Sequence, residues 1–129
     1  MGVTDRGLIR NRQYAAQIRD YSGLLYGKIT PTDIDGFVEF GDKLFVFIEL
    51  KHKDAPLPAG QRLALERLAD AVGETGRKSL LLIGEHDTNG DIEAAQCQVI
   101  AYRYHRKWRR PHRIMTIREC IDEIRKAPQ

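Results

Sequence analysis

The chain has 129 residues, of which 21 are Lys or Arg, 18 are Asp or Glu and 42% are hydrophobic, and its formal net charge is +3. A chain of this length can bury one hydrophobic core, so we expect a single domain over residues 1–129. Residues 1–6 lack the apolar core of a signal peptide, and no apolar run approaches the length of a membrane span. The sequence therefore argues against a membrane partner and predicts a soluble, cytoplasmic protein.

Two elements are predicted ahead of the central part of the chain. Residues 7–21 place Leu8, Ala15 and Ile18 at helical spacing, which predicts a helix. Residues 24–29 are largely apolar but are interrupted by Gly27, and they predict a short first strand.

A β-hairpin is predicted from residues 37–40 and 44–50, joined around Gly41 and Asp42. Successive side chains of a strand point to opposite faces, so Glu49 and Lys51 share one face at the end of an apolar run. Charged side chains in such a run oppose burial. Their presence there indicates a functional site.

The length of the hairpin loop decides whether two aspartates join this pair. A three-residue loop pairs Asp35 with Glu49 and Asp33 with Lys51, which gathers the four charges on one face. A two-residue loop would turn both aspartates to the other face. We favour the three-residue loop because it also matches apolar side chains of the two strands: Phe37 with Phe47, Val38 with Val46, and Ile34 with Leu50.

This charge cluster suits phosphoryl chemistry. Two carboxylates that converge with a backbone carbonyl are hard oxygen ligands, which suit Mg²⁺ or Mn²⁺. A lysine beside them would orient a water molecule or stabilise the charge that develops on phosphorus. The alternative is a solvated strand end with a surface Glu-Lys pair, which contributes little energy.

A second helix is predicted over residues 61–72. Leu65, Leu68 and Val72 fall on the same stripe as Gln61, which directs Gln61 back toward the end of the hairpin. Lys53 shares the face of Lys51 and is a candidate phosphate contact, although an ordinary surface lysine is the default interpretation.

The rest of the chain predicts two strands and a closing helix. Residues 79–83 form a continuous apolar run that is typical of a central strand, and residues 96–104 alternate, with Cys97, Val99 and Ala101 on one face. A capping box from Thr116 to Glu119 begins the helix, whose predicted inward residues are Ile117, Cys120, Ile121 and Ile124. We expect both cysteines to be reduced thiols. The order of elements predicts an α/β fold with a central mixed sheet flanked by helices.

Positive charge is concentrated near the end of the chain. Residues 1–93 hold 12 Lys or Arg against 15 Asp or Glu, whereas residues 94–129 hold 9 against 3. Cations mixed with aromatic side chains suit a phosphate backbone and an unstacked base, although a solvated basic loop is the alternative. The candidate nucleic-acid-binding residues are Lys53, Arg103, Arg106, Lys107, Trp108, Arg109, Arg110 and Arg113.

The motif around the hairpin consists of Asp35, a short strand, a turn, and then Phe47-Ile48-Glu49-Leu50-Lys51. It resembles the signature of the PD-(D/E)XK nuclease superfamily, which includes Holliday-junction resolvases, many restriction endonucleases and the small VRR-NUC nucleases of phages. The helix opened by Gln61 is similar to the helix that follows the lysine strand in the VRR-NUC and resolvase-like branches. The resemblance covers residues 8–104 and implies a restriction-endonuclease-like αβββαβ core.

The resemblance also implies a role for each matching residue. Asp35 and Glu49 would bind the metal together with the carbonyl of Leu50, Lys51 would be the catalytic lysine, and Gln61 would support them. Asp33 is the rival first acid, although its separation from Glu49 is longer than the family usually shows. The first predicted helix offers no Glu, which favours a one-metal site, or a Gln in place of the acid.

These observations predict a Mg²⁺- or Mn²⁺-dependent endonuclease that hydrolyses phosphodiester bonds in DNA. It would be a structure-specific enzyme for junctions or flaps, or a small phage-type nuclease. A homodimer is expected, because two active sites are needed to cut two strands. The alternative is a non-catalytic nucleic-acid-binding module on a nuclease scaffold, and the joint retention of Asp35, Glu49, Lys51 and Gln61 argues against it.

Overall fold

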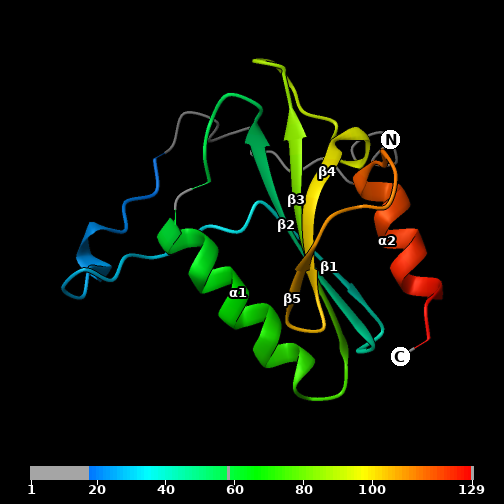
Figure 1. Ribbon diagram of the computed structural model, residues 1–129. Helices are drawn as coiled ribbons and strands as arrows, with labels where there is room; N and C mark the ends of the chain where they lie inside the picture. The colour runs from blue at the N-terminus through cyan, green and yellow to red at the C-terminus, as the bar shows by residue number, and fades with distance from the viewer. Residues whose placement is uncertain (1–17, 58, 129) are drawn as a thin grey trace, which may run out of the picture. The chain divides into compact units, whose positions relative to one another are not determined.

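The computed structural model describes residues 18–57 and 59–128 of the chain, which divides into two units, Met1–Pro31 and Thr32–Gln129 (Figure 1). The single domain expected over residues 1–129 stays a prediction. None of the helices in the described ranges has the length and apolar character needed to cross a bilayer.

The first unit differs from the sequence-based prediction in its described part. A short 3-10 helix, η2 (Ser22–Leu24), is followed by an isolated bridge between Tyr26 and Ile29. The strand predicted for residues 24–29 is wrong, because Gly27 at φ +63° turns the chain back on itself. Most of the helix predicted for residues 7–21 lies outside the described residues. Its described end is not helical, and Ile18 is exposed there.

The second unit is an α/β structure with a five-stranded mixed sheet. Within this unit, β2 and β3 run parallel, and the other neighbouring strands are antiparallel. Parallel neighbours need a crossover connection, which is provided here by the helix α1 (Ala59–Gly73). The strands follow the order β1 (Gly36–Phe40), β2 (Leu44–His52), β3 (Lys78–His86), β4 (Gln98–Tyr104) and β5 (Lys107–Arg109), with the 3-10 helix η3 (Ala94–Gln96) before β4 and the helix α2 (Ile117–Lys126) at the end.

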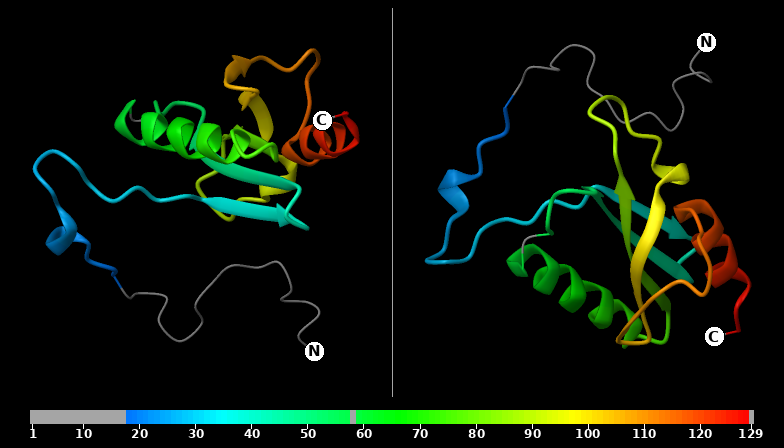
Figure 2. Two further views of the ribbon diagram at one scale, coloured as in Figure 1. Left: turned by 90° about the horizontal axis from the view of Figure 1, so that it is seen from below. Right: turned by 45° about the horizontal axis from the view of Figure 1, so that its top comes forward.

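The two α-helices cover opposite faces of the sheet. Val46 of β2 packs in one core with Ile117 of α2, whereas the next residue, Phe47, packs with Leu65 and Ala69 of α1. In Figure 1 and in the right-hand view of Figure 2, the strands lie between α1 and α2. Because both faces are covered, β3 is buried from Ser79 through Gly84, as the apolar run predicted.

The hairpin has the register of the three-residue loop. Phe40 pairs with Leu44, and Phe37 pairs with Phe47 at a ring-centroid distance of 5.3 Å. Asp42 in the loop has a φ of +64°. The predicted pairing of the two strands is therefore confirmed.

The closing helix α2 begins at the predicted capping box. The Thr116 side chain accepts a hydrogen bond from the Glu119 backbone N–H, and the Glu119 carboxylate accepts one from the Thr116 backbone N–H at 2.9 Å. At the other end of α2, Lys78 Nζ donates to the carbonyl oxygen of Ile124 at 2.9 Å. Cations stabilise helix C-termini, so Lys78 ties this end of α2 to the first residue of β3. The four residues predicted to face inward are all buried: Ile117, Cys120, Ile121 and Ile124.

Two predicted buried faces need correction. Leu68 of α1 is exposed, because the face toward the sheet is centred on Leu65 and Ala69. The register of β4 shifts by one residue, since Ile83 pairs with Ala101 but Gly84 pairs with Val99. Such an extra residue reverses the alternation of side chains. Val99 therefore packs on the α2 side, while Ala101 shares the α1 side with Ile83.

Both cysteines are buried and free, as expected. Strand β5 was not predicted from the sequence. The turn before it uses His105 at φ +52° and Arg106 at φ +64°, where a hairpin would ordinarily show Gly or Asn.

Candidate active site

Glu49 lies near the end of β2 on the face covered by α1, and its exposed fraction is only 2%. The strand is an interior one, so β1 and β3 flank it on its two sides. A carboxylate seldom occupies such a position without partners. The surroundings of Glu49 therefore define the candidate site.

Asp35 is joined to this strand end by two hydrogen bonds. Its backbone N–H donates to Glu49 Oε1 at 3.2 Å, and its Oδ2 accepts from the Leu50 backbone N–H at 2.7 Å. Asp35 itself is exposed, just before the first residue of β1. The structure thus brings together the exposed and the buried acid that the hairpin register predicted.

Gln61, in the first turn of α1, completes the group. Its Nε2 donates to Glu49 Oε2 at 2.5 Å and to the backbone carbonyl of Asp33 at 3.4 Å. The helical spacing had directed Gln61 toward the end of the hairpin, and the structure agrees. Asp33 also lies close, so both candidate first acids stand near Glu49.

The pKa of Glu49 is raised from 4.5 to about 7. Burial is the main cause, and the negative charges of Asp35 and then Asp33 add to it, while the hydrogen bonds from Asp35 and Gln61 oppose it. Among the residues that the structure describes, no Lys, Arg or His forms an ion pair with Glu49 or Asp35. Within residues 18–57 and 59–128, the negative charge of this acid pair is therefore not balanced by a cation, and a bound metal ion would relieve it.

The donor set fits a hard divalent cation. Asp35 and Glu49 offer carboxylate oxygens, which are the ligands that such ions prefer. The backbone of Leu50 is adjacent, since its N–H donates to Asp35 Oδ2. The described part of the chain contains no group of three or more His, Cys, Asp or Glu side chains arranged to hold a metal. Two carboxylates with backbone and water oxygens suit one Mg²⁺ or Mn²⁺ better than a site for two ions.

Lys51 has a partner that was not predicted. Its ammonium donates to Glu85 Oε2 at 3.1 Å and to the His52 carbonyl at 3.0 Å. Glu85 pairs directly with Lys51 across the parallel strands β2 and β3. The apolar run of residues 79–83 predicts a strand that ends before Glu85, whereas β3 continues to His86. A strand-helix-strand order predicts that β2 and β3 run parallel. Aligning the two strands in parallel would have placed Glu85 opposite Lys51.

Some of the predicted nucleic-acid-binding residues are already engaged. Arg103 forms a two-bond ion pair with Asp70 and is largely buried, and Arg106 pairs with Glu74. Arg113 lies near Glu119, at 3.4 Å. Within residues 18–57 and 59–128, the exposed side chains of Lys53, Lys107 and Arg110 form no ion pair.

Trp108 and Arg109 occupy the short strand β5. The Trp108 indole N–H donates to Glu66 of α1, and its ring packs partly against the core below that helix. Arg109 Nε donates to the Tyr104 carbonyl oxygen at 3.1 Å. The predicted basic segment is thus folded as the β4-β5 hairpin rather than as a loop.

No protein-family model, curated protein or solved structure matches this chain.

Proposed function

We propose that this protein is a metal-dependent deoxyribonuclease that hydrolyses phosphodiester bonds. The observation that carries the proposal is the group formed by Asp35, Glu49 and Gln61, which lies beside Lys51 at one end of the sheet. An acid pair that has no cationic partner in the described part of the chain, next to a lysine, suits the binding of a divalent cation and a phosphate.

Each residue of the group has a separate task in this proposal. Asp35, Glu49 and the Leu50 carbonyl would hold one Mg²⁺ or Mn²⁺, an ion that polarises a phosphate and lowers the pKa of water. Gln61 would keep the Glu49 carboxylate oriented through its hydrogen bond. Lys51 would orient the attacking water or donate to the phosphate oxygens as negative charge develops on them. Glu85 would hold the Lys51 ammonium in place between turnovers.

The proposal includes a restriction-endonuclease-like fold for the core. The succession of β1, β2, α1 and β3 supports the ββαβ part of a restriction-endonuclease-like core, with Glu49 and Lys51 on the strand that precedes the helix. Residues 24–29 do not form the additional first strand of the αβββαβ order. We expect a structure-specific or small phage-type enzyme that acts on DNA as a homodimer.

A second candidate is a nucleic-acid-binding module without catalytic activity. It is favoured by one observation, the pairing of Lys51 with Glu85 rather than with a group at the acid pair. Binding of DNA without cleavage in the presence of either metal would support this candidate.

The deciding experiment is cleavage of labelled junction, flap, duplex and single-stranded DNA with Mg²⁺, Mn²⁺ or EDTA. Asp35→Asn should remove metal-dependent cleavage, because it weakens a ligand and leaves the fold unchanged. Asp33→Asn is the matched variant and should weaken cleavage less. If Asp33→Asn is the more damaging of the two, Asp33 takes the role assigned to Asp35. If the wild-type protein cleaves none of these substrates, the catalytic proposal is wrong.

A further inference from the structure

A hollow of about 380 Å³ opens next to Lys51 and extends from it toward β5. It lies in the second unit, and its lining residues come mainly from α1, from the ends of β2 and β3, and from the β4-β5 hairpin. Its volume falls within the range of small-molecule sites, which begins at about 300 Å³. The lining residues are Lys51, Leu57, Arg62, Ile83, Ile100, Ala101, Trp108, Arg109 and Arg110.

Four of these side chains are cationic, and acids balance only part of their charge. Lys51 pairs with Glu85 at 3.1 Å, and Arg62 lies 3.7 Å from Glu66. The Arg109 side chain turns to the α2 face with its strand partner Tyr102, whereas Arg110 has no acidic partner among the described residues. The hollow therefore retains positive charge and favours an anion.

The walls of the hollow are apolar and aromatic. Trp108 forms one side, with the Arg62 guanidinium 4.8 Å above its ring. Ile83 and Ala101 are paired on the α1 face, and the unpaired Ile100 lies beside them. β-Bulges are common next to active sites, where they redirect side chains. An apolar floor, an aromatic wall and a cationic rim together suit a planar base that carries a phosphate.

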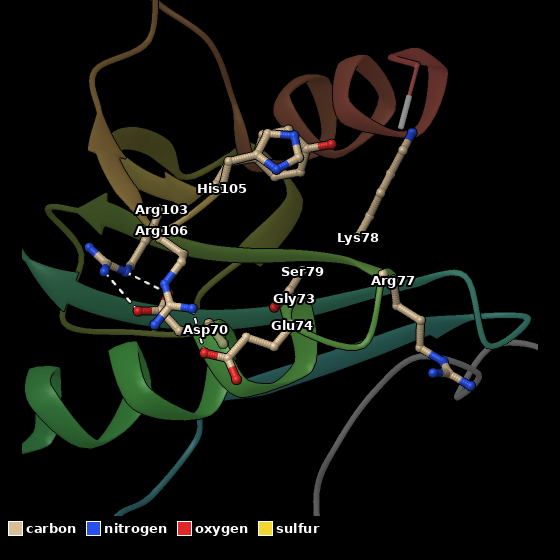
Figure 3. Close-up of a pocket in the computed structure, with 12 residues that line it drawn as sticks. Asp70, Gly73, Glu74, Arg77, Lys78, Ser79, Arg103, His105 and Arg106 are labelled. Atoms are coloured by element: carbon tan, nitrogen blue, oxygen red, sulfur yellow. Dashed lines mark hydrogen bonds and ion pairs between the residues drawn. The ribbon is translucent and has the colours of Figure 1, made fainter.

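A second hollow in the same unit shows a different arrangement. It lies at the far end of α1, has a volume of about 400 Å³, and is lined partly by Arg103 and Arg106. In Figure 3 these two arginines reach Asp70 and Glu74, and both ion pairs are drawn. Its two other cations are engaged elsewhere, since Arg77 pairs with Asp42 and Lys78 donates to the Ile124 carbonyl. Each of its four cations therefore already has a partner, unlike Arg110 in the hollow beside Lys51.

We propose that the hollow beside Lys51 holds one unpaired nucleotide of the DNA strand that the enzyme cuts. This inference rests on the proposed nuclease function and names the form of its substrate. A base stacked within a duplex presents only its edges, whereas an unpaired base offers a face to Trp108 and Arg62. Arg110 then binds its phosphate, and Lys51 lies between this subsite and the acid pair.

Trp108 is the only tryptophan of the chain, so its fluorescence reports on this hollow directly. The full chain is titrated in EDTA, where cleavage is absent, with a short oligo(dT), a blunt duplex and inorganic phosphate. Oligo(dT) should change the Trp108 emission to saturation. Arg110→Ala and Arg62→Gln should each raise its Kd about tenfold, the loss expected for one charge-assisted contact.

Arg118→Ala is the control, because it removes a cation from α2 on the opposite face of the sheet and should leave the Kd unchanged. Because the Arg62 guanidinium lies over the Trp108 ring, its replacement can itself change the fluorescence. The Kd values are therefore compared rather than the signal amplitudes, and Arg110→Ala tests the same subsite without touching the ring. An equal response to duplex, or to inorganic phosphate at the same concentration, would overturn the assignment to an unpaired nucleotide. The assignment would also be overturned if the Trp108 emission stayed unchanged while anisotropy showed that the protein binds DNA. A saturable response in a protein that cuts no DNA would support the subsite and contradict the nuclease proposal.

Discussion

The two ends of α1 handle charge in different ways. At its N-terminal end, Glu49 and Asp35 have no cationic partner among the described residues, and Arg110 nearby has no acidic one. At its C-terminal end, Arg103 is held by Asp70 and Arg106 by Glu74. Paired charges stabilise a fold or cost it little, whereas separated buried charges cost free energy. The difference marks the N-terminal end of α1 as the place where the described residues leave charges unpaired, which is where we propose the active site.

The largest effect expected from this comparison concerns Lys51. Lys51→Ala should lower the rate of cleavage by a factor on the order of a hundred or more, because it removes a contact that strengthens in the transition state. DNA affinity should change little, since Lys51 is one phosphate contact among several. Single-turnover cleavage and an anisotropy titration measure the two quantities. Lys43→Ala, in the hairpin loop just before the other end of β2, is the control and should cleave normally. Full activity of Lys51→Ala would remove the catalytic assignment.

A second, smaller effect concerns the buried acid. The pKa of Glu49 in the folded chain, about 7, lies above its ordinary value of 4.5, so protonation stabilises the folded state. This contribution is complete below pH 4.5 and is lost as the pH rises through 7. Glu49→Gln mimics the protonated form, and its stability should exceed that of the wild type by about 2 to 3 kcal/mol above pH 7.5 in EDTA.

Urea unfolding at several pH values measures this difference. Mg²⁺ or Mn²⁺ should reduce the loss of stability that the wild type shows at high pH, because the cation favours the ionised carboxylate. Either metal should have little effect on the stability of Glu49→Gln. The exposed Glu93→Gln is the matched control and should follow the wild type. A wild-type stability that does not fall between pH 4.5 and pH 7.5 would show that Glu49 ionises at its ordinary pKa.

The smallest effect separates the arginines at the two ends of α1. Each phosphate contact contributes about 0.7 to 0.9 to the slope of log K against log salt. Arg110→Ala should reduce the slope of DNA binding by about this amount, whereas Arg106→Ala should leave it unchanged because Glu74 already binds that guanidinium. Anisotropy titrations over a range of salt concentrations measure both slopes. Equal reductions for the two variants would mean that the paired arginine binds DNA as well, and the contrast between the two ends would then fail.

The parts that the sequence predicted are those governed by short-range periodicity. Alternation along the hairpin identified the pairing of Phe37 with Phe47 and thus the meeting of Asp35 with Glu49. Helical spacing placed Gln61 at the same point. These features depend on residues close together in the chain or on one turn of known length.

The parts that it did not predict depend on partners far apart in the chain. Asp70 and Arg103 are separated by 33 residues, and nothing in the sequence indicates that these two charges form an ion pair. Lys51 and Glu85 meet only because a parallel pair of strands aligns them. The resemblance that suggested a nuclease assigns roles to the acid pair, but it offers no account of these pairings.

The extra residue in β4 also limits how the chain can change in length. Because the register shifts between Ile83 and Gly84, Val99 points to one face of the sheet and Ala101 to the other. Deletion of Ile100 would restore strict alternation and turn one half of the strand over. Either Val99 would leave the core beneath α2, or Arg103 would leave Asp70. A single-residue deletion is therefore expected to be far more damaging here than in the turn that follows β4, although each removes only one side chain.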